Sequence, residues 1–125
     1  MITSADNPRF KQAKALLTRR GRIQAGQSLA EGVRLIEDAM GAGIIPALVF
    51  FEEGSLTIRS RALLDQLAVA RVPLLEVTST LFENISDTVS SQGVIAVVPI
   101  RCCAWQGTSP LILILDSVRD PGNVG

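Results

Sequence analysis

Short apolar runs alternate with segments of helical periodicity along most of this chain. The runs are rich in Val, Leu, Ile and Phe and are flanked by Gly, Pro or polar residues, which is typical of strands. The predicted strands cover residues 28–31, 46–51, 74–77 and 94–98. Apolar positions spaced three and four apart predict helices over residues 8–20, 33–40, 58–71 and 79–85. This alternation predicts an α/β fold, arranged as a three-layer α/β/α sandwich.

Capping residues and breakers set the expected ends of these elements. Asn7 followed by Pro8 predicts the start of the first helix, and Gly21 predicts its end. Gly32 is expected to turn the first strand into the second helix, with the carboxylate of Glu31 capping that helix. The polar segment 86–93 is predicted to be a long loop.

The last stretch of the chain combines a strand pattern with a turn. Five consecutive aliphatic residues at 111–115 predict a strand buried on both faces, and Asp116 ends it. The turn sequence Asp-Pro-Gly-Asn follows at 120–123, at the kind of strand end where α/β sheets bind ligands. Residues 101–110 have the composition of an interdomain linker. The expected organisation is therefore a domain over 1–100, a linker over 101–110, and the start of a second domain over 111–125.

Composition excludes several classes of protein. The chain has 125 residues, 47% hydrophobic and 19% charged, without an apolar run of membrane-spanning length or a signal peptide, so a cytoplasmic protein without membrane contact is expected. No histidine is present, which excludes His-dependent triads and His metal sites. Cys102 and Cys103 are adjacent, and neither a four-ligand metal site nor a disulfide framework can be built from them.

The charges are unevenly distributed, although the net charge is zero. Residues 1–35 carry seven basic and two acidic side chains, whereas the rest of the chain carries five basic and ten acidic ones. Such an asymmetry is expected when one end of a protein faces phosphate groups. The candidate RNA-binding residues are Lys11, Lys14, Arg19, Arg20, Arg22 and Arg34. The alternative is an ordinary solvated helix face.

The turn and several other segments together resemble one known family. The matching segments, in chain order, are Ile2-Thr3-Ser4, Asn7-Pro8, Lys11, Arg19-Arg20, Glu31-Gly32-x-Arg34-Leu35-Ile36, Gln92-Gly93-Val94-Ile95-Ala96 and Asp120-Pro121-Gly122-Asn123-x-Gly125. In this order they resemble the SpoU (TrmH-like) family of RNA 2′-O-ribose methyltransferases, within the SPOUT superfamily. The first 100 residues match its N-terminal substrate-binding domain, and the last 15 match the start of its methyltransferase domain.

The resemblance carries expectations about fold and chemistry. It implies the fold of kink-turn-binding ribosomal proteins for residues 1–100, followed by the first strand of a truncated α/β knot. The full-length protein is expected to use S-adenosylmethionine, to form a homodimer through the missing C-terminal domain, and to act on structured RNA of ribosomal type. Asn123 is expected in the active-site loop beside an Arg that lies beyond Gly125 in the family. Because the family's cofactor loops also lie downstream, residues 1–125 alone are expected to bind no cofactor and to be inactive.

Two other functions remain as alternatives. A stand-alone, non-catalytic RNA-binding module of ribosomal-protein type would share the fold, but it gives no reason for the strand and turn after residue 110. A small metabolic α/β enzyme is disfavoured because neither a Gly-rich phosphate loop nor a nucleophile elbow is present. The sequence does not identify the target nucleotide.

Overall fold

The computed structural model describes residues 1–102, 107–108, 111 and 113–114, and shows a mixed α/β fold built on one four-stranded sheet. The described elements, in chain order, are α1 (Pro8–Ala15), α2 (Arg19–Ala25), β1 (Gln27–Glu31), α3 (Val33–Gly41), β2 (Leu48–Phe51), the 3-10 turn η1 (Glu53–Ser55), α4 (Ile58–Val69), β3 (Leu74–Glu76), α5 (Ser79–Glu83) and β4 (Val94–Pro99). The four strands predicted between residues 28 and 98 are confirmed to within two residues at each end, and so are the helices that begin at Val33, Ile58 and Ser79.

The sheet has the strand order β1-β4-β2-β3. Its central strand β4 runs antiparallel to both neighbours, with Glu31 opposite Ile95 and Phe50 also opposite Ile95. Strands β2 and β3 run parallel, and Ile2 adds a parallel bridge to Val77 beyond the end of β3. The carboxyl ends of β2 and β3 therefore lie side by side at one end of the sheet.

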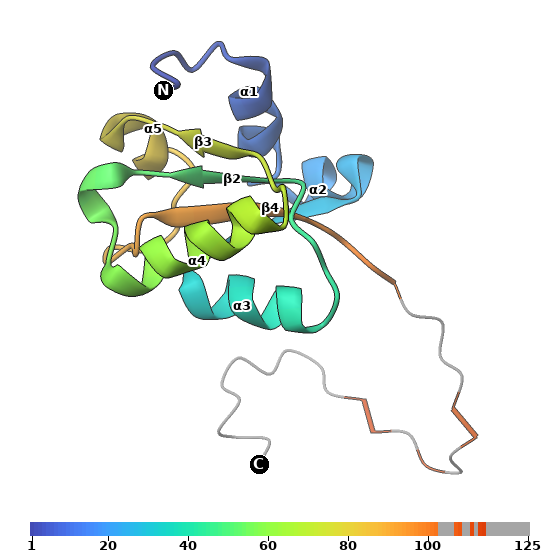
Figure 1. Ribbon diagram of the computed structural model, residues 1–125. Coiled ribbons are helices and arrows are strands. Elements are labelled where there is room, and N and C mark those ends of the chain that lie inside the picture. The colour runs from blue at the N-terminus through green and yellow to red at the C-terminus, as the bar shows by residue number, and fades with distance from the viewer. Residues whose placement is uncertain (103–106, 109–110, 112, 115–125) are drawn as a thin grey trace.

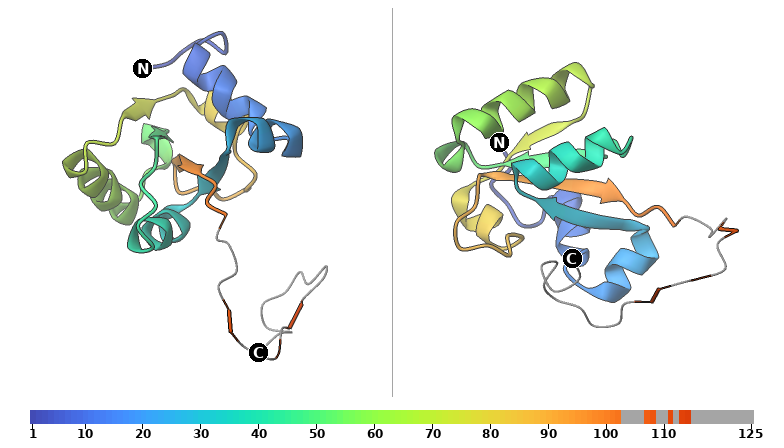
Figure 2. Two further views of the ribbon diagram at one scale, coloured as in Figure 1. Left: turned by 90° about the vertical axis from the view of Figure 1, so that its right-hand side faces the viewer. Right: turned by 90° about the horizontal axis from the view of Figure 1, so that it is seen from below.

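Two apolar clusters lie on opposite faces of this sheet, because neighbouring side chains of a strand point to opposite sides. Ile95 and Phe50 belong to a cluster with α1 and α5, in which the rings of Phe10 and Phe50 meet edge to face. Val94 and Val49 belong to a second cluster with α3 and α4. The helices accordingly cover both faces of the sheet (Figures 1 and 2). Each fully buried aliphatic or aromatic side chain contributes about 1.5–3 kcal/mol to this packing.

The single helix predicted over residues 8–20 is wrong, because the structure contains two helices with a break at residues 16–18. Thr18 begins the second helix by accepting a hydrogen bond from the backbone N–H of Gly21 at 3.1 Å. Gly21 does not end a helix but lies within α2, and the left-handed residue that ends α2 is Gly26, with φ of +63°. The N-cap prediction for Asn7 is confirmed, since its side chain accepts from the N–H groups of Arg9 and Phe10.

Two residues of the final apolar run, 112 and 115, lie outside the described residues. Leu111, Leu113 and Ile114 are exposed and are not part of a strand. The turn at residues 120–123, including Asn123, lies outside the described residues, as does Cys103. In the part of the chain that the structure describes, no helix has both the length and the apolarity to cross a membrane.

Candidate nucleic-acid interface

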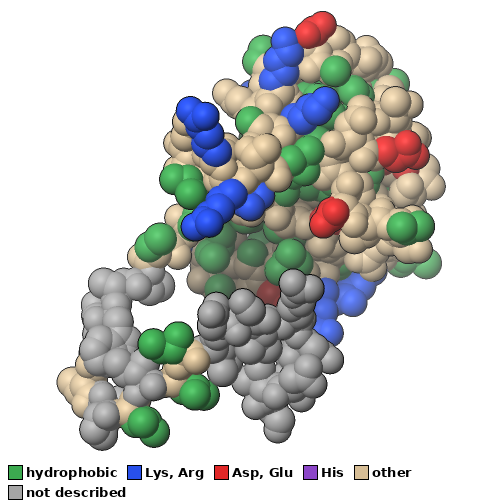
Figure 3. Space-filling model, turned by 180° about the vertical axis from the view of Figure 1, so that it is seen from behind, with side chains coloured by type: hydrophobic (Ala, Val, Ile, Leu, Met, Phe, Trp, Pro, Cys, Tyr) green, Lys and Arg blue, Asp and Glu red, His purple; other side chains and the backbone are tan. Residues whose placement is uncertain are grey.

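Basic side chains gather over α1 and α2 on one side of the molecule (Figure 3). Lys11 and Lys14 extend from α1, and Arg19, Arg20 and Arg22 extend from α2. All of them except Arg22 are exposed. Lys11 also pairs with Asp6 at 2.9 Å, but both side chains are largely in solvent, where such a pair contributes little stability. We call this surface the basic face. Because its Lys11–Asp6 ion pair is weak, the cations of this surface can bind other anions.

Arg22 has a structural task within the basic face. Its Nη1 donates hydrogen bonds to the backbone carbonyls of Leu16 and Leu17, at 3.1 and 3.2 Å. These carbonyls belong to the turn after α1, where helical partners are lacking. Arg22 therefore holds the α1–α2 turn together, and a cation placed there also faces the negative end of α1.

Arg34 lies on a separate element, the first turn of α3. It borders a shallow hollow together with Glu31, Asp38 and Gln92. A second hollow, lined by Arg22, Leu35 and the loop residue Asp87, shares Glu31 with the first. Arg22 and Arg34 thus border neighbouring hollows that meet at Glu31, although they come from different helices.

Glu31 anchors the long loop between α5 and β4. Its carboxylate accepts hydrogen bonds from Ser86 Oγ at 2.6 Å, from the backbone N–H of Asp87 at 2.8 Å, and from Thr88 Oγ1 at 2.8 Å. Burial alone would raise the pKa of this carboxyl group, but the hydrogen bonds from the loop outweigh it, and the pKa is lowered. Glu31 is therefore an ionised anchor that fixes residues 86–88 beside α2 and α3.

The prediction that Glu31 caps α3 is wrong, because another side chain occupies that position. Gln92 Oε1 accepts a hydrogen bond from the backbone N–H of Val33 at 2.9 Å. Gly32, at φ of +94°, turns the chain from β1 into α3 while its N–H donates to the carbonyl of Val94. The antiparallel pairing of β1 with β4 brings Gln92 next to Val33. The cap of α3 therefore comes from a residue 59 positions away in the sequence.

Gly93, the residue after Gln92, connects the junction of β1 and α3 to the end of β2. It has φ of +74°, and a Cβ atom at this position would lie 2.9 Å from the carbonyl oxygen of Glu52. The carbonyl of Gly93 accepts from the N–H of Glu52 at 3.0 Å. The two short motifs Glu31-Gly32 and Gln92-Gly93 are therefore structural partners, which join β1, α3 and the end of β2 to the loop.

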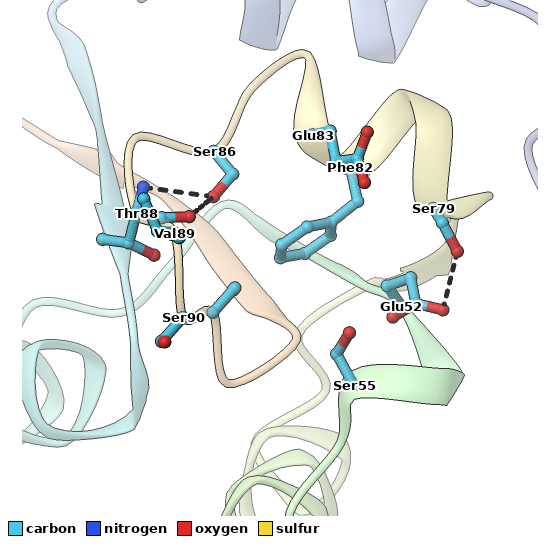
Figure 4. Close-up of a pocket in the computed structure, with 10 residues that line it drawn as sticks. Glu52, Ser55, Ser79, Phe82, Glu83, Ser86, Thr88, Val89 and Ser90 are labelled. Carbon is cyan, nitrogen blue, oxygen red and sulfur yellow. Dashed lines mark hydrogen bonds between the residues drawn. The ribbon is translucent and has the colours of Figure 1, made fainter.

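A polar hollow on the other side of this loop was not predicted from the sequence (Figure 4). It has a volume of about 720 Å³ and lies where β2 ends, between η1, α5 and the loop. Its lining residues are Glu52, Ser55, Ser79, Phe82, Glu83, Ser86, Thr88, Val89, Ser90 and Ser91. We call it the hydroxyl-lined hollow. The Ser and Thr residues within 86–91 are the only sign of this hollow in the sequence. The sequence does not show which other segments of the fold lie opposite this loop.

Glu52 is a charged group of the hydroxyl-lined hollow that is held by several hydrogen bonds. Its Oε1 accepts hydrogen bonds from the backbone N–H of Gly54 at 3.0 Å and from Ser79 Oγ at 3.1 Å. A hydrogen bond from the Ser55 side chain is the main reason that the pKa of this carboxyl group is lowered, and it outweighs the opposing effect of burial. Among the described residues, no three His, Cys, Asp or Glu side chains form a group that could hold a metal ion.

Comparison with known proteins places these features in a family context. The family model described as the MRM3-like substrate binding domain matches residues 7–96. An uncharacterized tRNA/rRNA methyltransferase of Synechocystis is 33% identical over 99% of this chain and 46% of its own length. The human rRNA methyltransferase 3, mitochondrial, is 33% identical over 83% of this chain and 26% of its own length.

Solved structures show the same relationship. A crystal structure of an RNA 2′-O ribose methyltransferase has a TM-score of 0.73 and 34% identity, over 98% of this chain and 48% of that one. The SpoU methyltransferase AviRb from Streptomyces viridochromogenes, in complex with the cofactor AdoMet, has a TM-score of 0.62 and 27% identity, over 76% of this chain and 34% of that one. The chain thus spans less than half the length of each of these proteins.

Proposed function

This chain belongs to the MRM3-like substrate-binding domain family, and we propose on that premise that it binds structured ribosomal RNA for a SpoU-type ribose 2′-O-methyltransferase. The observation that carries the proposal is the basic face of α1 and α2, which belongs to the part of the chain that matches the family. Phosphate contacts supply most of the sequence-independent affinity of proteins for nucleic acids. They also fix the position of the nucleic acid on the protein.

The proposed division of work follows from the chemistry of ribose methylation. A 2′-hydroxyl must be aligned with a methyl donor and must lose its proton, so holding the RNA in place is a large part of the task. We propose that the whole protein uses S-adenosylmethionine, as the AdoMet complex of AviRb supports, and that Asn123 belongs to its active-site loop. Homodimerisation of the whole protein, and the absence of cofactor binding by residues 1–125 alone, stay predictions.

We also propose that the domain is the three-layer sandwich of the kink-turn-binding ribosomal proteins. The support is the presence of one apolar cluster on each face of the sheet, with α1 and α5 on one side and α3 and α4 on the other. The stand-alone ribosomal-protein-like module is not favoured, because the relatives that match this chain are named as methyltransferases.

Salt-dependent RNA binding tests the proposed function. The Arg19→Ala, Arg20→Ala double variant removes two exposed cations of α2, so the slope of log affinity against log salt should become shallower by about 1 to 2. Filter binding with a structured fragment of ribosomal RNA, across a series of salt concentrations, measures this slope. Sequence preference should change little, since phosphates carry no base identity.

The matched control is the Arg59→Ala, Arg61→Ala variant on α4. Helix α4 packs on the opposite side of the sheet, and these two exposed arginines pair with Glu37 and Glu53. Their removal should leave the slope at the parent value. An α2 variant that binds like the parent at every salt concentration would show that the basic face is only a solvated surface.

A further inference from the structure

We propose that the hydroxyl-lined hollow receives an unpaired guanine base of the bound RNA, with the Glu52 carboxylate accepting hydrogen bonds from the guanine N1–H and 2-amino groups. The inference rests on the proposed function, since the base must belong to an RNA that the domain already holds. It adds a base preference to a surface that otherwise contacts the backbone.

The charge of the hollow selects the kind of ligand. Its lining contains two carboxylates, Glu52 and Glu83, and six hydroxyl-bearing residues, and no Lys or Arg. A phosphate group would be repelled there, whereas a neutral group with N–H donors would be attracted. The volume of about 720 Å³ is within the usual range for ligand sites and accommodates a base with part of its sugar.

Glu52 distinguishes the four bases by their donors. Guanine presents N1–H next to the 2-amino group, so that two adjacent donors can point at one carboxylate. Uracil presents one N–H between two carbonyl oxygens, which a carboxylate repels. Adenine and cytosine each present an amino group next to a ring nitrogen that is itself an acceptor. A carboxylate at the end of the hollow therefore favours guanine.

The carboxylate is fixed before any ligand arrives. The N–H of Gly54 and the hydroxyl of Ser79 both donate to Oε1, so that Glu52 is held at the end of β2. The pKa of Glu52 is lowered from its ordinary value of 4.5, so the group is ionised at neutral pH. In Figure 4 the ring of Phe82 lies between Glu52 and the loop residues Ser86 and Ser90. Phe82 is only 3% exposed and packs in the apolar cluster with α1, so it forms part of the floor of the hollow, and Val89 is the other apolar residue of the lining.

The hollow lies within reach of RNA on the basic face. Thr88 lines both the hydroxyl-lined hollow and the neighbouring hollow that Arg22 borders. The loop 86–88, anchored by Glu31, is thus the shared wall between a cation of α2 and the proposed base site. An RNA strand with its phosphates along α2 needs to cross only this loop to place a base against Glu52.

Short RNAs that differ in one base test the inference. The probes are uridine heptamers with a central G, inosine, A, C or U, titrated against the 125-residue chain by fluorescence anisotropy at one low salt concentration. The G heptamer should bind about tenfold more tightly than the A, C and U heptamers. Inosine, which lacks the 2-amino group, should fall between G and the others. Glu52→Gln keeps the acceptor for Gly54 and Ser79 but removes the charge, and it should reduce the G preference to about twofold or less.

Glu53→Gln is the matched control, because Glu53 is the next residue but pairs with Arg61. It should keep the full preference for G. Equal affinity of the parent for all five heptamers, or a G preference that survives Glu52→Gln, would overturn the inference. If the α2 double variant also flattens the salt dependence while the heptamers bind equally, the proposed RNA function stands and only the base site fails. If salt dependence and base preference are both unaffected by their variants, both proposals fail.

Discussion

At the scale of single residues, Gly21 determines how closely α1 and α2 approach each other. A Cβ atom built at this position would lie 1.8 Å from the carbonyl oxygen of Ala15, which is backbone and cannot rotate away. The glycine is needed for contact rather than for backbone conformation. The sequence shows a glycine at this position but not that it contacts Ala15 at the end of α1. Sequence patterns therefore predict the helix break at Gly21, whereas the structure has it at Thr18.

The Gly21→Ala variant should be less stable by about 2–3 kcal/mol, because the two helices must separate to admit a methyl group. Urea denaturation followed by circular dichroism measures the change. Gly41→Ala is the control: it ends α3, and its Cβ would meet no atom within 4 Å. That variant should be neutral or more stable by up to about 1 kcal/mol. Similar losses in both variants would refute the close approach at Gly21.

At the scale of elements, the loop 86–93 owes its position to contacts that sequence patterns do not reveal. The four strands up to residue 99 and three of the helices follow from local periodicity, which predicts them to within two residues. The partners of Glu31 lie more than fifty positions further along the chain, at Ser86, Asp87 and Thr88. The motif residues were therefore recognised, but the role given to Glu31 was wrong. The hydroxyl-lined hollow was missed for a related reason, since the parallel pairing of β2 with β3 is needed to bring Glu52 beside Ser79.

At acid pH, protonation of Glu31 should weaken the hydrogen bonds that hold the loop 86–88. The folded-state pKa of Glu31 lies below its ordinary value of 4.5, so its contribution to stability is complete above that pH. The contribution is lost as the pH falls through the lower folded-state pKa. Glu31→Gln should cost about 1–2 kcal/mol at neutral pH, and the parent and the variant should become more similar in stability under acid conditions.

Urea denaturation at neutral pH and at several acid pH values measures this convergence. Glu83→Gln, an exposed residue of α5, is the control and should run parallel to the parent at every pH. Amide hydrogen exchange should show faster exchange at Asp87 in the Glu31 variant, because its N–H loses a charged acceptor. A constant difference between parent and variant across the whole pH range would exclude an ionised anchor.

At the scale of the whole molecule, the packed part of the described chain ends near residue 100. The members of both apolar clusters lie between Ile2 and Val98. The last backbone hydrogen bond of the sheet region joins the N–H of Ile100 to the carbonyl of Gly26. The predicted domain boundary at residue 100 is consistent with this packing, and it stays a prediction about independent folding.

Residues 1–100 alone should unfold cooperatively, with a stability within about 1 kcal/mol of the 125-residue chain. Denaturation curves and overlaid amide spectra of the two proteins provide the comparison. The longer chain should also associate more, since Leu113 and Ile114 are about 80% exposed apolar residues. Leu113→Ser with Ile114→Ser in the longer chain should reduce that association without changing the denaturation curve. Loss of cooperativity in residues 1–100 would place the boundary further along the chain.

The central position of β4 has a consequence for synthesis of the protein. Within the described sheet β1 pairs only with β4, and β4 is the last strand to be made. Closing a sheet through its final strand demands contacts between distant parts of the chain, which is slow. The described sheet therefore cannot be completed on the ribosome until residue 99 has emerged. Until then, the first 35 residues, with seven basic and two acidic side chains, belong to a chain whose sheet is still open.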